Sequence, residues 1–458
     1  MTLRNHGDFR KLWAGQAVSE IGSRISREGI PMGAVLMMGI TPLTMSGLSL
    51  ATQLPASLVG LFLGVWVDRL ARRPLLIGAD ITRAILLLGI PVAALLGHLQ
   101  LWMFFGVAAL SGVLSLLFDV SYQAYLPWLI DRKNLVEGNS KLGITASLAE
   151  VVGPGLAGIL VQFLTVPFAI AIDALTYLFS ALSLWRIEAR ESKPQARETQ
   201  SVETVSVETV SVETLSADDC RAAETTKEGN RQQEHSHAAS SQGQGQRQAY
   251  WRAELAEGLK AVRHNRTLLA LAEAAATLGF TSSAVFVLDT LYALRDLGLS
   301  PLLFGFTVTV GGVGALLGAA ISRHVVRFLG IGKTLLVTLF LQGIAASFWV
   351  AASGSVLRAT LWLLGAQLLG DTSGMVYGIV ESTVRQTIVP DALLGRVNAT
   401  IRVLDVGFTA VGSFMAGLIA NTIGIRSTMA LAACGMVLSV LWLLLSPIRK
   451  LRNLPTVP

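Results

Sequence analysis

Charged residues occur inside the first apolar stretch of the chain, where an unpaired charge would be costly. Glu20, Arg24 and Glu28 follow one another at intervals of four residues, and Arg27 lies beside them. On a helix, this spacing places the three side chains in one stripe. If the helix begins near residue 9, Glu20 lies about 16 Å along its axis. We therefore expect Glu20 and Arg24 to face a water-filled cavity or the protein interior. An ion-pair ladder that only holds helices together would explain the same spacing.

Asp119 lies in a later apolar stretch and has no basic residue within one helical turn. Tyr122 shares its helical face and could donate a hydrogen bond to it. A carboxyl group that is shielded from water and from cations can bind and release a proton, whereas a neighbouring arginine favours the ionised form. Asp119 is therefore the preferred proton-coupling residue. Glu20, which lies beside Arg24, is better suited to be a paired cavity charge.

Two further acid–base pairs lie near the ends of later apolar stretches. Glu381 precedes Arg385 by four residues, and Arg402 precedes Asp405 by three. These spacings allow contact on one face of a helix. We predict that both pairs serve gating or hold the local structure. Further acidic residues within the apolar stretches include Glu150, Asp173, Glu273 and Asp371.

The elements that must position these side chains are membrane-spanning helices. The 458 residues are 52% hydrophobic and only 14% charged, whereas soluble domains have about 25% charged residues. A bilayer removes the need for a polar exterior, and about 20 apolar residues span it. The sequence therefore predicts an all-α membrane protein with twelve transmembrane helices. Two sets of six apolar stretches lie at residues 9–38, 43–66, 74–96, 100–128, 140–164 and 167–187, and at residues 266–291, 301–328, 332–352, 357–388, 396–420 and 425–446.

Lysine and arginine predict the orientation of the chain. Alternate connections between the apolar stretches are basic, and the other connections carry at most one Lys or Arg. Because basic residues are retained in the cytoplasm, we expect both termini to be cytoplasmic in a bacterial inner membrane. The formal net charge of +6 therefore does not call for a nucleic-acid partner. The basic connections contain Arg69, Arg72 and Arg73, then Arg132 and Lys133, then Arg323, Arg327 and Lys333, and then Arg396.

A polar segment at residues 188–248 separates the two sets of six. It contains 11 Asp/Glu and 7 Lys/Arg, and Ser-Val-Glu-Thr recurs from residues 201, 206 and 211. Because such a composition cannot bury a core, we expect a disordered cytoplasmic linker. His235 and His237 have no further ligands nearby, so a metal site is not expected. The predicted domains are residues 1–187, this linker, and residues 249–458, which begin with a helix in the membrane interface near Tyr250.

The connection after the second apolar stretch has a characteristic spacing. Gly64, Asp68, Arg69, Arg72 and Arg73 form the pattern G-x-x-x-D-R-x-x-R-R. This pattern resembles the loop signature of the major facilitator superfamily, although alanine replaces the usual glycine in the turn. The resemblance implies two pseudo-symmetric six-helix bundles around a central cavity. It also implies that Asp68 and Arg72 act as a cytoplasmic latch between the two halves.

Other stretches resemble the macrolide-efflux and enterobactin-exporter branch of the drug:proton antiporters within that superfamily. Among them are residues 73–83, Asp173-Ala-Leu-Thr-Tyr177, and the fifth stretch with Gly153, Pro154 and Gly158. Proline kinks a helix and small residues allow close packing, and in this superfamily a similar G-P-x-x-G motif is associated with exporters. One departure is that no Lys or Arg lies between Arg83 and Arg132, where many antiporters carry an arginine in the fourth span.

The resemblance implies proton-coupled efflux of amphiphilic, drug-like or siderophore-like small molecules by alternating access. The proton gradient would be the energy source without a cofactor, and a monomer surrounded by membrane lipid would suffice. The same fold could also serve uptake or lipid flipping, and a non-transporting sensor could bind its ligand without moving it. An enzyme is poorly supported, because the sequence contains no H-E-x-x-H, G-x-S-x-G or P-loop pattern.

Overall fold

The computed structural model describes residues 6–67, 70–189 and 257–451. These residues form twelve long helices and no strand. Nine of the helices in this described part are long and apolar enough to cross a membrane. The first helix is not among the nine, and it carries the charged stripe from Glu20 to Glu28. The chain is an all-helical, multi-pass membrane protein, as the sequence predicts.

The twelve helices form two groups of six. The first group is α1 (Gly7–Met38), α2 (Pro42–Val67), α3 (Arg72–Leu95), α4 (Leu101–Leu129), α5 (Leu135–Leu164) and α6 (Val166–Trp185). A helical segment at residues 257–264 then leads into the second group. This group is α8 (Arg266–Leu291), α9 (Pro301–Leu329), α10 (Ile331–Ala351), α11 (Val356–Ile388), α12 (Asp391–Ile423) and α13 (Ile425–Leu444). The predicted 188–248 linker lies almost wholly outside the described residues, as does the predicted start of the interfacial helix near Tyr250.

One-residue turns show the internal likeness of the two halves. Gly424 joins α12 to α13 with φ 88° and ψ 157°, and Thr165 joins the corresponding helices α5 and α6 with φ 75° and ψ 162°. This backbone conformation is essentially restricted to glycine. Among the described residues, Thr165 is the only non-glycine residue with positive φ. The first half therefore carries local strain at a turn where the second half does not.

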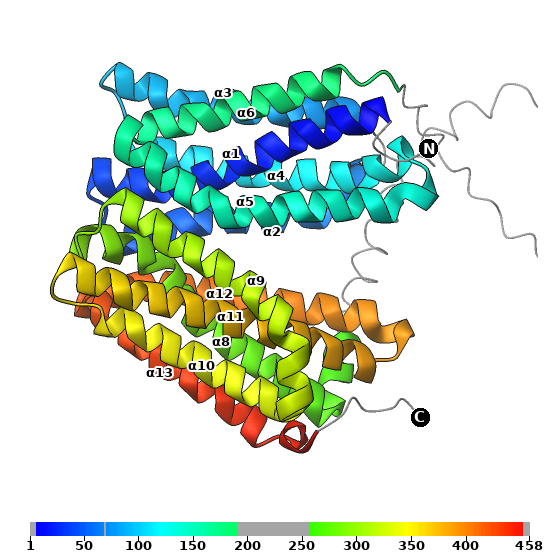
Figure 1. Cartoon of the computed structure of the whole chain (residues 1–458), viewed down its shortest axis with the longest axis vertical. Coiled ribbons are helices and arrows are strands. Elements are labelled where there is room, and N and C mark those ends of the chain that lie inside the picture. Colours follow the sequence, from blue (N-terminus) through cyan, green and yellow to red (C-terminus); the bar gives the residue numbers. More distant parts are fainter. Residues whose placement is uncertain (1–5, 68–69, 190–256, 452–458) are drawn as a thin grey trace, which may run out of the picture.

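The two halves contact each other through α5 with α9 and through α2 with α12. At the end of the molecule away from the termini, one apolar core includes residues of both halves, such as Ile30 and Val161 with Leu291 and Phe304. At the end that carries the termini, the apolar cores belong to one half each. In Figure 1 the two sets of ribbons correspondingly converge at the end away from the labelled termini. The contact that closes the molecule therefore lies at one end only.

Small residues bring the helices together at this closed end. Gly158 of α5 lies against the backbone of Pro301 and Gly305 in α9. Gly417 of α12 lies against Ser46 of α2. In addition, Arg295 donates a hydrogen bond from Nη1 to the carbonyl oxygen of Ile40 at 3.3 Å. The predicted motif Gly153-Pro154-x-x-x-Gly158 thus lies in a continuous helix and forms part of the seam between the halves.

Candidate functional site

The predicted stripe on α1 forms an ion-pair bridge. Nη2 of Arg24 lies 3.2 Å from Oε1 of Glu20, and its Nη1 pairs with Glu150 of α5. The Arg24 side chain is largely buried, whereas that of Glu150 is about half exposed. The Cβ of Arg24 occupies the space that a side chain at Gly153 would need. Because Gly153 has no side chain, Arg24 has room to form the ion pair that links α1 to α5.

The ion pairs of the stripe do not extend to Glu28. Glu28 is partly buried on α1 and is within electrostatic range of Asp289, which lies on α8 in the other half. Asp289 accepts a hydrogen bond from the Thr290 hydroxyl at 2.9 Å. Two carboxyl groups from opposite halves therefore approach each other. The spacing on α1 could not reveal this approach, because the second carboxyl comes from a helix more than 200 residues later in the chain.

Asp119 is exposed on α4. Three arginines and one glutamate act on it electrostatically: Arg83, Arg27, Arg24 and Glu20. It therefore belongs to the same charged region as the α1 stripe. The predicted hydrogen bond from Tyr122 is not formed, because the buried hydroxyl of this tyrosine has no partner among the described residues. Its ring instead stacks on Phe118, with 6.0 Å between the ring centroids.

Arg83 is the functional candidate that the sequence prediction missed. It lies on α3, is 4% exposed, and forms an ion pair with Asp80. Its guanidinium carbon lies 4.6 Å from the ring centroid of Phe118 on α4 and 4.2 Å from that of Tyr177 on α6. A guanidinium group thus contacts the fourth span although that span contains no basic residue. The Asp80–Arg83 spacing within an apolar stretch is the signal that could have revealed it.

One of the two predicted gating pairs is present. Nη1 of Arg385 lies 3.1 Å from Oε1 of Glu381, and both side chains are largely buried on α11. The second pair is not formed as an ion pair, since no contact within 4.0 Å joins Arg402 to Asp405, although the two interact electrostatically. Instead, the carboxyl of Asp405 packs against α8 at Gly279, which has no side chain to exclude it.

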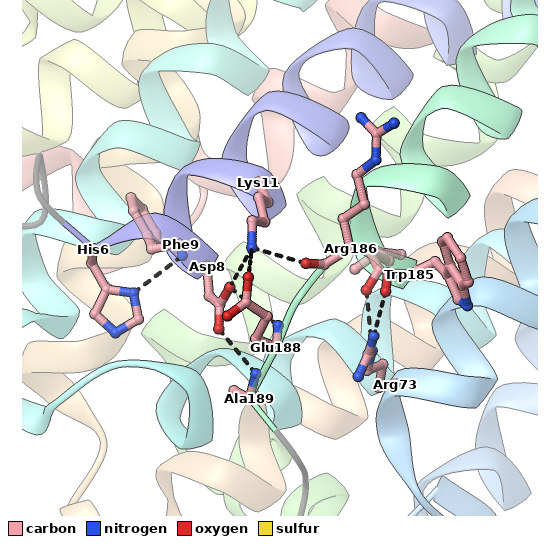
Figure 2. A network of polar contacts seen from close by, with 10 residues as sticks. His6, Asp8, Phe9, Lys11, Arg73, Trp185, Arg186, Glu188 and Ala189 are labelled. Carbon is pink, nitrogen blue, oxygen red and sulfur yellow. Dashed lines mark hydrogen bonds and ion pairs between the residues drawn. The ribbon is translucent and has the colours of Figure 1, made fainter.

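The predicted latch is described only in part, because Asp68 and Arg69 lie outside the described residues. Arg73 donates hydrogen bonds from Nε to the carbonyl oxygen of Leu184 at 3.1 Å and from Nη2 to that of Trp185 at 2.6 Å. These carbonyl groups lie at the end of α6, where the helix offers no N–H group four residues further on, and that of Leu184 also accepts a hydrogen bond from the Ile187 N–H at 3.3 Å. Arg73 therefore caps a helix of its own half (Figure 2). Arg72 is half-buried at the start of α3, and Gly64 lies near the end of α2.

A polar cluster fixes the start of α1 to the segment that follows α6 (Figure 2). Lys11 Nζ lies 3.0 Å from Asp8 Oδ1 and 3.2 Å from Glu188 Oε1, and it donates a hydrogen bond to the carbonyl oxygen of Arg186 at 2.8 Å. Asp8 also accepts hydrogen bonds from the backbone N–H groups of Glu188 and Ala189. The exit from α6 is therefore bound to the first turn of α1.

Two clefts lie along α9 and α11. One of about 640 Å³ is lined by Asp371, Gly374 and Ser382 among others. The other, of about 940 Å³, lies at the end of the bundle that carries the termini and includes Arg323, Arg327 and Lys333 in its wall. Both clefts share Ile379 and Thr383. A groove with a basic entrance therefore leads towards Asp371, which interacts electrostatically with Glu150 of the other half.

A model of the Major Facilitator Superfamily matches residues 12–404 of this sequence. The chain belongs to the major facilitator superfamily. The two six-helix groups and the loop signature are those expected of this superfamily of membrane transporters. The resemblance inferred from the sequence is confirmed.

Curated relatives are of low identity. The chain is 24% identical to the enterobactin exporter EntS of Citrobacter koseri, with coverage of 100% of this chain and 96% of the relative. It is 28% identical to macrolide efflux protein A of Streptococcus pyogenes over 176 residues, which cover 38% of this chain and less than half (43%) of that protein. The uncharacterized MFS-type transporter YfiS of Bacillus subtilis is 23% identical over 96% of this chain and 93% of its own length.

Solved structures confirm the fold. The inward-facing crystal structure of a bacterial homologue of the iron transporter ferroportin matches with a TM-score of 0.67 at 17% identity, over 97% of this chain and 98% of that one. The nucleoside transporter NupG matches with a TM-score of 0.62 at 11% identity, over 95% and 98% of the two chains. At this identity, the likeness concerns the fold alone.

Proposed function

We propose that the protein is a proton-coupled exporter that moves amphiphilic, drug-like or siderophore-like small molecules across the bacterial inner membrane by alternating access. The observation that carries the proposal is the charged region between the halves. Glu150 of α5 pairs with Arg24 and also acts electrostatically on Asp371 of α11. When the space between the halves opens or closes, the distance between charges of the two halves changes, and so does their interaction energy. The names of the curated relatives support export over uptake or lipid flipping.

The groove along α9 and α11 supports a small-molecule substrate. Volumes of 300–1,000 Å³ are typical of small-molecule sites, and both clefts fall in this range. The walls combine apolar side chains such as Met375 and Ile379 with polar ones such as Ser382. Such walls suit molecules that are partly apolar and partly polar. The basic entrance would attract molecules with a negative group.

In the orientation that we propose, both termini lie in the cytoplasm. Support comes from Arg323, Arg327 and Lys333, which line the cleft at the end that carries the termini, because basic residues are retained on the cytoplasmic side. The described conformation is then open to the cytoplasm and closed by the α5–α9 contact on the other side. No cofactor is needed, since the proton gradient supplies the energy, and a monomer in membrane lipid contains the whole groove.

Asp119 remains our candidate for the proton-coupling residue. It is exposed and lies within electrostatic range of Arg83 and of the α1 stripe, so gain or loss of its proton changes the charge that these arginines experience. Arg83 comes from a different helix, α3. Its proximity means that proton release from Asp119 would be followed by attraction to a neighbouring guanidinium group.

The test uses proteoliposomes that contain the purified protein, a fluorescent amphiphilic dye with a negative group, and an imposed pH gradient. We expect accumulation that is driven by the gradient and abolished when an ionophore collapses it. Transport that ignores the gradient would remove proton coupling, and binding without accumulation would indicate a sensor. Asp119→Asn should transport without coupling to protons. The matched control is Asp131→Asn, which changes a 72%-exposed aspartate in the connection after α4 and should behave like the parent protein.

A further inference from the structure

A second group of charges is enclosed within the first half, away from the groove. Asp80 and Arg83 of α3 and Asp173 of α6 are 0%, 4% and 0% exposed, respectively. They lie where α1, α3, α4 and α6 pack together. The proposed transport cycle assigns no role to Asp80 or Asp173. Buried charges destabilise a protein unless they are paired, so the charge state of these two carboxyl groups requires a physical explanation.

The charges in this cluster do not balance if both carboxyl groups are ionised. Arg83 is the single cation, and its ion pair is with Asp80. Its remaining surroundings are the rings of Phe118 and Tyr177 and the hydroxyl of Ser115, which accepts a hydrogen bond at 3.3 Å. Asp173 interacts with Arg83 only at longer range. One guanidinium group and two carboxylates would leave a net charge of −1 among side chains that are at most 4% exposed.

The contacts of Asp173 identify the carboxyl group that carries the excess charge. Its Oδ1 accepts a hydrogen bond from the Thr176 hydroxyl at 3.0 Å. Its Oδ2 is buried and has no hydrogen-bond partner among the described residues. A Cβ atom at Gly22 of α1 would lie 2.5 Å from Oδ1, so the α1 backbone closes tightly over this group. Oδ2 of Asp80 is likewise without a hydrogen-bond partner, but Asp80 is in an ion pair with Arg83. Asp173 has only hydroxyl groups beside it and no cation in contact, so an ionised Asp173 would be the uncompensated charge.

The surroundings of Asp173 are otherwise polar but uncharged. From α1 the Ser26 hydroxyl faces Asp173 and acts on it as a neutral hydrogen-bonding group, although it forms no hydrogen bond of good geometry. Ser23 contacts the Tyr177 hydroxyl at 2.8 Å. From α3 the charged groups that act on it are Arg83 and Asp80. The exposed acid of α4, Asp119, acts on Arg83.

The acid of α5, Glu150, forms its ion pair with Arg24 of α1. Among the residues that the structure describes, the packed helices therefore supply no cation other than Arg83 to Asp173.

We propose that Asp173 holds a proton in this conformation and forms an occluded proton-binding site behind α1. A proton bound to Oδ2 gives a neutral carboxylic acid, leaves Asp80 and Arg83 as a balanced pair, and removes the unpaired charge. Asp119 and Asp173 then both interact electrostatically with Arg83, one of them exposed and the other enclosed. Within the proton-coupled export proposed above, on which this role rests, movement of α1 would open Asp173 to exchange its proton.

The test is infrared spectroscopy of the purified full chain in lipid vesicles at neutral pH, without substrate and without a gradient. We expect the carbonyl stretching band of a protonated carboxylic acid, and the loss of one carboxyl group's share of that band in Asp173→Asn. Asparagine has nearly the same shape as the neutral acid, so the variant should fold. Asp131→Asn is the matched control and should leave the band unchanged.

The charge balance of the cluster also predicts the infrared spectrum of a second variant. In Asp80→Asn, Asp173 is the only enclosed acid left near Arg83, since Asp119 is exposed, so Asp173 should ionise and the same share of the band should disappear. A band that is absent from the parent protein, or that persists in Asp173→Asn or in Asp80→Asn, overturns the proposal. The band requires no transport. Its absence would leave proton-driven export standing, and a failure of proton-driven export would leave the band in place.

Discussion

Replacement of Gly158 by alanine tests whether the α5–α9 contact holds the molecule closed at one end. The new Cβ would lie 2.5 Å from the carbonyl oxygen of Pro301 and 3.1 Å from the Cα of Gly305. Both neighbours are backbone atoms, so no side chain can rotate away. Ordinary contact begins near 3.4 Å. The two helices must therefore separate by about 0.9 Å at this point, or the methyl group must be accommodated under strain.

The size of the effect follows from the cost of overpacking. An extra carbon in a tightly packed site costs about 1–3 kcal/mol. The cost falls on the conformation in which the two helix ends touch, and it disappears when they part. The equilibrium should therefore shift by about 5–150-fold towards the conformation that is open at this end. Gly143→Ala is the matched control, because a Cβ there meets nothing within 4 Å on the same helix.

The assay measures how fast a membrane-impermeant thiol reagent labels a reporter cysteine in the other seam of the closed end. Ser46 is suitable because it is fully buried against Gly417. The reporter Ser46→Cys is placed in a chain whose natural residues Cys220 and Cys434 are replaced by serine. Labelling should accelerate in Gly158→Ala and stay at the parent rate in Gly143→Ala. Equal rates in all three proteins would refute the assignment of the closing contact to α5 and α9.

Two further changes should alter stability in opposite directions. Arg24→Gln removes the bridge between α1 and α5 and leaves two carboxylates without their cation, so we expect a loss of about 1–3 kcal/mol. Thermal unfolding in detergent measures this loss, and Arg27→Gln, at an exposed neighbour, should unfold close to the parent temperature. Thr165→Gly relieves the strained turn between α5 and α6 and should stabilise the protein by about 1 kcal/mol. The reverse change at the corresponding turn, Gly424→Thr, should destabilise it, and a Thr165→Gly protein that melts no higher than its parent would contradict the strain argument.

The sequence predicted the helices well because lipid imposes a simple rule on length and composition. The predicted stretch 357–388 corresponds to α11, Val356–Ile388, and 332–352 corresponds to α10, Ile331–Ala351. The prediction was poorer where a helix continues beyond the apolar region. The fifth stretch was predicted from residue 140, whereas α5 begins at Leu135. Apolar composition marks the part of a helix that lies in lipid, and the polar first turns of α5 have no such mark.

The site was predictable only within single helices. The pair of Glu20 with Arg24 follows from their spacing, because residues four apart are neighbours on any helix. Glu150 is the other partner of Arg24 and comes from α5, which no spacing rule connects to α1. The same limit affected Asp119. It has no cation within one turn of α4, but Arg83 of α3 acts on it from a neighbouring helix. The periodicity of the sequence shows which residues share a face of a helix. Which residues of other helices contact that face is decided by the packing.

The single apolar core that joins the two halves at their closed end also has a thermal consequence. Opening that end would expose apolar surface such as that of Leu291 and Phe304. Exposure of apolar surface raises the heat capacity, and the attraction between apolar groups weakens on cooling. The free-energy difference between the two conformations should therefore depend on temperature in a curved, not a linear, way. Cooling should favour opening of this end, so that the resting conformation of this transporter depends on the temperature at which its cell grows.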